Sequence, residues 1–300
     1  MNKLLVICGA TATGKTELAV NCAKKLKSEV VSADSQLVYK GLNIGTAKPT
    51  LEEMFGITHH MIDIIEPKYS FSVSDYAAIA EPIVDGLLQN GKTPVICGGT
   101  GFYINSLLFD FSYGNAAADC AVRLKYQTVL EEHGKEYLYN LLRSIDPQSA
   151  SVLHVNDTKR IIRALEIYEV SGKRKSELQD GLKCKREYFA VAIDYPRDIL
   201  YERINARVDR MFDSGLIDEI AGLLAEGIDE SYQCMQAIGY KEVLECLKNN
   251  KNESIMREII KQNTRHYAKR QITFFKKLKN IVWLKPENAS ADIILELLNG

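Results

Sequence analysis

The chain has 300 residues, of which 46% are hydrophobic and 26% charged, and its formal net charge is −1. This composition is that of a globular protein with a buried core, and it excludes a disordered chain and a uniformly basic protein that coats nucleic acid. No apolar run approaches the roughly 18–20 residues of a membrane-spanning helix, so we expect no membrane partner. The seven cysteines form no C-x-x-C pair, and the chain enters its first strand directly, so we expect reduced thiols and a cytoplasmic protein without a signal peptide.

The first motif is a glycine-rich loop between a predicted strand at residues 4–8 and a predicted helix at residues 17–26. The loop fits G-x-x-x-x-G-K-[ST] without a mismatch, over Gly9, Ala10, Thr11, Ala12, Thr13, Gly14, Lys15 and Thr16. In such a loop the backbone amides and the helix N-terminus bind phosphate oxygens, the lysine adds a full positive charge, and the threonine hydroxyl can ligate Mg²⁺. The alternative is a glycine-rich turn without a ligand, which the complete match disfavours. The motif therefore predicts a phosphate site but leaves the phosphate compound open.

Polar residues follow two further predicted strands. Residues 28–35 form a strand that ends at Asp34 and Ser35, and a buried strand at residues 95–97 ends in a tight loop that contains Thr100. Because parallel strands place their C-terminal ends at the same sheet edge, we expect Asp34 and Thr100 to face the phosphate loop. Taken alone, each could be a cap of a helix or turn. Together they could accept a proton from a weak nucleophile and fix its direction.

A further short strand is predicted at residues 61–65, directly after His59 and His60. For the two histidines we expect hydrogen-bonding or packing roles, because no partner cysteine or matching histidine lies nearby. Asp63 is expected inside this strand rather than at its end. The chain therefore lacks the strand ending in an acidic residue with which an ordinary P-loop ATPase holds Mg²⁺.

Residues 114–186 have a helical character and are predicted to form an insert between core strands, so that the core comprises residues 1–113 and 187–300. Arg160 and Arg163 lie three residues apart and share a face of one of its helices. The expected fold is thus α/β, with a P-loop-like parallel-sheet core and an inserted helical domain. Its predicted helices cover residues 123–132, 135–144 and 159–170.

The C-terminal part is strongly basic. Between Lys241 and Lys279 there are 11 Lys or Arg residues against four Asp or Glu, a net charge of +7. On the last long helix, expected over residues 253–278, basic residues recur every fourth position. Most charge runs are solvated helix faces, but a stripe with so few opposite charges favours a polyanionic partner. The stripe consists of Arg257, Lys261, Arg265 and Lys269.

Eight short segments, spread over the whole chain, occur in a characteristic order. They are residues 9–16, 34–39, 45–49, 59–63, 98–101, 156–166, 237–240 and 264–271. On these segments the chain resembles the bacterial tRNA dimethylallyltransferases, also called tRNA isopentenyltransferases. It departs from the family pattern at Ala10, where proline is usual, and at Phe274, where tryptophan is common.

This resemblance implies transfer of a dimethylallyl group from dimethylallyl diphosphate to N6 of the adenosine on the 3′ side of the anticodon, with release of diphosphate. It assigns residues 9–16 and Arg207 to the diphosphate, Thr16 to Mg²⁺, Asp34 to the role of general base and Thr100 to orienting the amine. It also implies binding of the tRNA anticodon stem-loop through the insert and the tail helix, and we expect a monomer. The candidate tRNA-binding residues are Ser35, Gln36, Arg160, Arg163, Arg265, Lys269 and Arg270.

Two other functions fit parts of the sequence. A small-molecule kinase that uses ATP would need a nucleoside-triphosphate site and a lid arginine near the γ-phosphate. A non-enzymatic P-loop protein that binds RNA would need a vestigial phosphate cradle, which the intact Lys15 and Thr16 disfavour.

Overall fold

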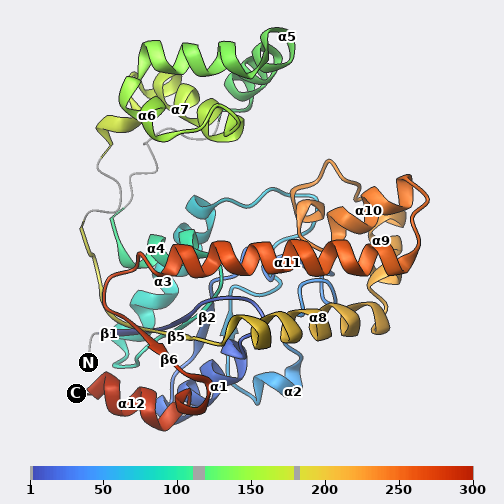
Figure 1. Cartoon of the computed structure of the whole chain (residues 1–300). Helices are drawn as coiled ribbons and strands as arrows, with labels where there is room; N and C mark the ends of the chain where they lie inside the picture. The colour runs from blue at the N-terminus through green and yellow to red at the C-terminus, as the bar shows by residue number, and fades with distance from the viewer. Residues whose placement is uncertain (1–2, 111–118, 179–182, 300) are drawn as a thin grey trace. The chain divides into compact units, whose positions relative to one another are not determined.

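The computed structural model describes residues 3–110, 119–178 and 183–299. Six strands of these residues form one sheet in the order β3-β2-β4-β1-β5-β6 (Figure 1). Every neighbouring pair is parallel, so the C-terminal ends of the strands meet at one edge. This arrangement confirms the predicted fold class, and β6 is the expected edge strand. The strands are β1 (Lys3–Cys8), β2 (Val30–Ser32), β3 (His59–His60), β4 (Val95–Gly98), β5 (Glu187–Ile193) and β6 (Ile281–Leu284).

Helices cover both faces of the sheet. On one face, α1 (Lys15–Leu26) and α12 (Ala291–Asn299) pack on a core that includes side chains of β1, β4 and β5. On the other face lie α3 (Val73–Gln89), α4 (Gly101–Leu108) and α11 (Glu253–Phe275) (Figure 1). Tyr76 of α3 joins that layer to the sheet, because its hydroxyl donates to the Ser32 carbonyl (3.0 Å) while its ring stacks on Tyr103 of α4. The central strands, buried on both faces, are therefore almost continuously apolar.

The described residues form seven further α-helices and three 3₁₀ segments. Among the described residues, none of the helices combines the length and the apolar character that crossing a membrane requires. The other α-helices are α2 (Leu51–Met54), α5 (Cys120–Ile145), α6 (Pro147–Val152), α7 (Thr158–Ser171), α8 (Arg197–Asp213), α9 (Leu216–Ala225) and α10 (Tyr240–Lys248). Three 3₁₀ segments cover Lys175–Glu177, Gln233–Gln236 and Pro286–Asn288.

The chain divides into two compact units, one of Met1–Leu108 with Arg186–Gly300 and one of Phe109–Lys185. The insert was expected to span residues 114–186, and its expected first residue lies outside the described residues. The second unit is built from α5, α6 and α7 around its own apolar core. Two of the predicted helices are the halves of α5, which changes direction at Gly134, where φ is 81°.

The strand predicted at residues 61–65 is wrong. The strand is His59–His60 itself, and the chain then turns through left-handed conformations at Met61 (φ 64°) and Asp63 (φ 54°), which no strand accommodates. Asp63 therefore follows its strand instead of lying within it. Its carboxylate pairs with the ammonium of Lys48, whose Nζ also donates to the Tyr39 carbonyl (2.8 Å). Asp63 thus fixes the loop of residues 41–49.

Candidate active site

The loops that follow β1, β2 and β4 line one pocket of about 90 Å³ at the C-terminal edge of the sheet. The phosphate loop contributes Lys15 and Thr16, and the turn after β2 contributes Asp34. Helices from later in the chain close the pocket with Arg207 of α8 and with two residues of α11. Segments far apart in the sequence therefore meet where the parallel-sheet topology predicts a ligand site.

The phosphate loop has the curled backbone that its motif predicts. Its positive φ angles fall at Gly9 (128°), Ala12 (63°) and Gly14 (83°). The Thr13 hydroxyl donates to the Ala10 carbonyl (2.9 Å), and the Lys15 ammonium donates to the same carbonyl (2.5 Å). Lys15 therefore lies folded over the loop, where it can reach an anion that the backbone amides bind.

The pocket carries positive charge from two half-buried side chains, Lys15 and Arg207. Burial lowers the pKa of Lys15, and the nearby Arg207 acts in the same direction, whereas Asp34 opposes it. Burial likewise lowers the pKa of Arg207, whose guanidinium donates to the Thr46 carbonyl (2.9 Å). Two cations thus share a pocket with one carboxylate, and taking them out of water is costly unless an anion joins them. The pocket is therefore electrostatically suited to a multiply charged anion.

Asp34 and Thr100 are held next to each other. The Thr100 hydroxyl accepts a hydrogen bond from the Ser35 amide (3.0 Å), and one Asp34 carboxylate oxygen accepts from the Gln36 amide (2.9 Å). The two loops touch through their backbones, because a Cβ at Gly98 would lie 2.1 Å from the Ala33 carbonyl oxygen. Only glycine fits that position. Asp34 lines the pocket directly, as do Gly98 and Gly99 of the loop that carries Thr100, whereas Thr100 itself is not a lining residue.

Gln271 is a site residue that sequence reasoning did not single out. Its side chain, buried in α11, accepts from the Thr11 amide of the phosphate loop (2.9 Å) and donates to the Gly99 carbonyl (3.0 Å). One amide therefore joins the loop that binds phosphate to the loop that carries Thr100. Its place in the last of the eight family segments was the one sequence feature that pointed to it. No general catalytic or binding motif marks a glutamine at such a position as functional.

Tyr267, one helical turn before Gln271, also lines the pocket. Its hydroxyl interacts with the side chains of Thr100 and Gln271, and burial raises its pKa, so that it stays neutral. Tyr267 and Gln271 together hold α11 against the phosphate loop and the loop that carries Thr100.

Arg203 and Glu219 stabilise two loops beside the pocket, the phosphate loop and the loop 41–49. Arg203 of α8 donates to the Ala12 carbonyl of the phosphate loop (2.8 Å). Glu219 of α9 accepts from three successive amides of the loop 41–49, at distances of 2.8, 2.7 and 3.1 Å, and from the Tyr240 hydroxyl (2.6 Å). Such charge-assisted hydrogen bonds are the strong ones. They hold Thr46 and Ala47 at the pocket rim.

Both histidines make the hydrogen bonds that were expected. His59 lines the pocket with its Nδ1 against the Ile57 carbonyl (2.9 Å), and burial lowers its pKa. The Nε2 atom of His60 lies 2.7 Å from a carboxylate oxygen of Glu29. Across the described ranges, no three His, Cys, Asp or Glu side chains are grouped so as to hold a metal ion.

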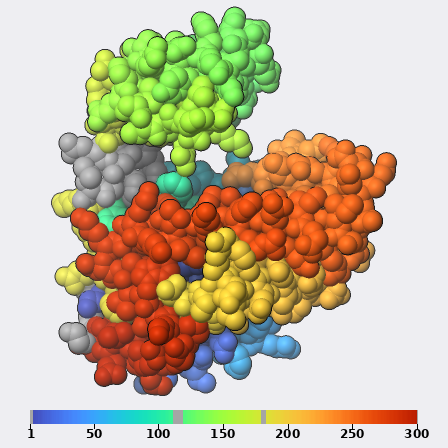
Figure 2. Space-filling view, in the orientation of Figure 1, coloured from blue at the N-terminus to red at the C-terminus, as the bar shows by residue number. Residues whose placement is uncertain are grey.

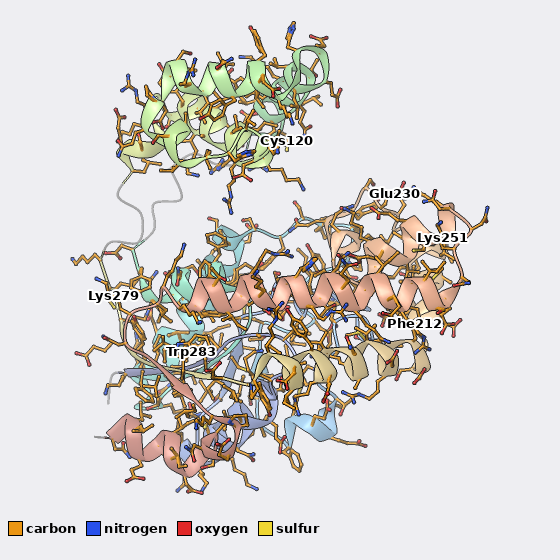
Figure 3. The ribbon with its side chains drawn as sticks, in the orientation of Figure 1. Cys120, Phe212, Glu230, Lys251, Lys279 and Trp283 are labelled. Atoms are coloured by element: carbon orange, nitrogen blue, oxygen red, sulfur yellow. The ribbon has the colours of Figure 1, made fainter. Side chains whose placement is uncertain are left out.

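Two of the four residues of the expected basic stripe form ion pairs within the chain. Arg257 pairs with Asp213 (2.8 Å) and Glu253 (2.7 Å), and Lys261 pairs with Asp209 (3.0 Å). The Arg257 guanidinium also lies over the ring of Phe212, which Figure 3 shows near the end of α8. The expected stripe with few opposite charges is therefore partly neutralised within the chain, by acids of α8 and by Glu253 of α11.

The other candidate tRNA-binding residues differ in their surroundings. Arg265 donates to the Asn205 side chain (2.7 Å), whereas Lys269 and Arg270 are exposed. In the second unit, Arg163 pairs with the fully buried Glu166 (2.8 Å) and so supports that unit's core. Arg160 is exposed, 3.6 Å from Asp157. Of these two arginines, Arg163 is therefore engaged within its own unit, whereas Arg160 is exposed to solvent.

The fold and the site define an α/β enzyme with a P-loop-like cradle, and known proteins specify it further. The family model "IPP transferase" matches residues 37–278, and the model "Isopentenyl transferase" matches residues 2–66. The chain is 41% identical to a tRNA dimethylallyltransferase of Acetivibrio thermocellus, over 97% of this chain and 94% of that protein. It is 45% identical to one of Caldanaerobacter subterraneus subsp. tengcongensis, over 94% and 91%.

Solved structures of proteins with the same described activity are also similar to this chain. The tRNA isopentenylpyrophosphate transferase of Bacillus halodurans is similar with a TM-score of 0.74 and 39% identity, covering 100% of this chain and 95% of that one. A eukaryotic dimethylallyltransferase acting on tRNA is similar with a TM-score of 0.79 and 29% identity, covering 95% and 74%. The chain belongs to the tRNA dimethylallyltransferase family, a class of prenyltransferases. This membership supports prenyl transfer over the small-molecule kinase.

Proposed function

We propose that this protein transfers a dimethylallyl group from dimethylallyl diphosphate to N6 of the adenosine on the 3′ side of the anticodon in a tRNA. One observation carries the proposal: Lys15, Arg207 and Asp34 line the same pocket. The two cations suit a departing diphosphate, and the carboxylate suits a proton that must leave the attacking amine.

The reaction exchanges one bond for another. The N6 lone pair forms a bond to C1 of the dimethylallyl group while the bond from C1 to the diphosphate oxygen breaks. Diphosphate leaves with that electron pair, and the amine loses a proton to the Asp34 carboxylate. Loop amides and Lys15 stabilise the charge that develops on the leaving oxygen, which is the contribution that raises the rate.

Orientation of the amine is the second requirement. An exocyclic adenine amine is a weak nucleophile, so alignment must supply much of the rate, and good alignment contributes about 7–11 kcal/mol. The Thr100 hydroxyl, held between Ser35 and Tyr267, is suited to bind the amine beside Asp34. A stacked base cannot reach such a pocket, so the target adenosine has to be flipped out of its loop.

The pocket also suits Mg²⁺. This ion takes one or two protein oxygens, keeps several waters and binds substrate phosphates, and Thr16 offers a hydroxyl oxygen in the pocket. Thr16 would hold the ion, which would neutralise charge on the diphosphate.

We assign tRNA binding to the second unit and to the exposed cations of α11. In Figure 2 the orange-red band of α11 forms part of the exposed surface of the first unit. The protein is proposed to act as a monomer, and a tRNA substrate supports a cytoplasmic location.

Reversing two of these charges should weaken tRNA binding. For Lys269→Glu with Arg270→Glu, we expect the salt dependence of tRNA affinity to fall by about 1.5 in the slope of log K against log salt, because each lost phosphate contact contributes about 0.7–0.9. The KM for dimethylallyl diphosphate should stay unchanged. A matched double variant at exposed lysines of the opposite helix layer, Lys24→Glu with Lys27→Glu, should leave the slope as it is. Equal slopes in the two double variants would refute this assignment.

The function itself is tested by incubating the protein with Mg²⁺, labelled dimethylallyl diphosphate and unmodified tRNA. We expect label in the tRNA, and none in a tRNA with guanosine at the target position. ATP consumption on a small substrate, without label in tRNA, would overturn the proposal in favour of a kinase. Binding of tRNA without transfer would favour a non-enzymatic protein.

A further inference from the structure

Phe102 is a large apolar side chain that lies in solvent beside the active site. It is 63% exposed, although it follows Thr100 by only two residues, at the beginning of α4. Leaving an aromatic ring in water forfeits the favourable free energy of its burial. A ring in this place is therefore suited to contact a ligand that arrives at the site.

A second ring holds Phe102 in position. The ring centroids of Phe102 and Phe274 are 5.5 Å apart at an interplanar angle of 64°, the edge-to-face geometry that aromatic pairs favour. Phe274 in turn presses on the loop of Thr100, because a Cβ at Gly101 would lie 2.1 Å from its ring. The two rings form a rigid feature, here called the aromatic platform, where α11 contacts α4.

A row of side chains links the aromatic platform to the pocket. Arg270 lies one helical turn before Phe274 on α11, is exposed, and has its guanidinium 5.8 Å from the centroid of the Tyr267 ring. Tyr267 lines the pocket and contacts Thr100. Aromatic rings beside exposed cations are the combination that single-stranded nucleic acid requires, because the rings stack on bases and the cations bind phosphates.

We infer that the aromatic platform of Phe102 and Phe274 stacks a nucleobase adjacent to the flipped adenosine, with Arg270 at the RNA backbone. The inference rests on the proposed function. It commits to an RNA occupant, because the flanking charge is positive and the platform adjoins the loop of Thr100. Stacking a neighbouring base would compensate for the stacking that the flipped adenosine loses. The platform would thus position the RNA strand, while Asp34 and Thr100 act on the amine.

The test uses the full chain and anticodon stem-loop RNAs that carry 2-aminopurine, a fluorescent adenine analogue, at either neighbour of the target adenosine. Binding of the wild-type protein should quench one of the two probes. Phe102→Leu keeps an apolar side chain but has no ring face, so we expect the quenching to be lost. Phe102→Ala should weaken RNA binding about tenfold, and Phe102→Tyr should restore affinity and quenching. The KM for dimethylallyl diphosphate should not change in any of these variants.

Two controls keep the outcomes separate. Leu297→Ala removes an exposed apolar side chain from α12, on the opposite layer, and should change neither binding nor quenching. Thermal unfolding midpoints of the Phe102 variants should match that of the wild type, since the ring is mostly in solvent. Wild-type quenching and affinity in Phe102→Leu would overturn the aromatic platform while prenyl transfer stands. Absence of label in tRNA with the wild-type protein would instead overturn the proposed function.

Discussion

Asp34→Asn is expected to slow prenyl transfer to tRNA by about two to four orders of magnitude, the contribution of a positioned general base. Asparagine keeps the size of the side chain and can still accept from the Gln36 amide, as Asp34 does (2.9 Å), but it cannot take a proton from the amine. Single-turnover transfer of labelled dimethylallyl to tRNA measures the effect. Binding of inorganic diphosphate, followed by calorimetry, should survive, because the phosphate loop is intact.

Asp292→Asn is the matched control for this substitution. Asp292 forms an exposed ion pair with Lys25 on the opposite layer (2.5 Å), and surface pairs of this kind contribute little. Its transfer rate should equal that of the wild type. Transfer by Asp34→Asn at the rate of Asp292→Asn would remove Asp34 from the chemistry.

Gln271→Leu is expected to lower turnover about 100-fold, because a displacement of about 1 Å between reacting groups can have this effect. The leucine fills a similar volume but leaves the Thr11 amide and the Gly99 carbonyl without their shared partner. Each unsatisfied buried group costs about 1–3 kcal/mol, so the thermal unfolding midpoint should also fall. Steady-state kinetics and a thermal melt on the same preparation measure both effects.

Gln271→Glu separates the two hydrogen bonds. Glutamate can still accept from Thr11 but cannot donate to Gly99, and its charge lies against the diphosphate site, so we expect a higher KM for dimethylallyl diphosphate. Gln262→Leu, at an exposed position of the same helix, controls for the loss of an amide and should behave as the wild type. Wild-type turnover in Gln271→Leu would show that the bridge does not position the loops.

The parallel sheet and the phosphate loop were predictable because each rests on a local pattern. The residues around Gly9 and Lys15 alone specify a strand, a curled loop and a helix. The meeting of Asp34 and Thr100 followed from topology, since parallel strands end at one edge. The roles of these residues in catalysis remain predictions that the substitutions above test.

The incorrect predictions concern segments where contacts with residues far away in the sequence override the local sequence pattern. Residues 61–65 are apolar enough for a strand. The backbone turns there instead, with positive φ angles at Met61 and Asp63, and the Asp63 carboxylate pairs with Lys48 of a distant loop. Arg257 and Lys261 were expected to belong to a basic stripe, but they pair with acids of α8, about 50 residues earlier, and Arg257 also pairs with Glu253 of its own helix. The role of Gln271 was not predictable for a similar reason, because both of its hydrogen-bond partners lie in the first hundred residues.

The bridge at Gln271 also bears on how the protein is made. The hydrogen bond between Thr11 and Gln271 spans 260 residues, and ribosomes add about 5–20 residues per second. Thr11 of the phosphate loop is therefore synthesised roughly 13 to 52 seconds before its partner Gln271. A nascent chain, or a fragment that stops before α11, has the anion-binding motif but lacks the side chain that sets it against Thr100. We therefore expect prenyl transfer to begin only once nearly the whole chain has been translated.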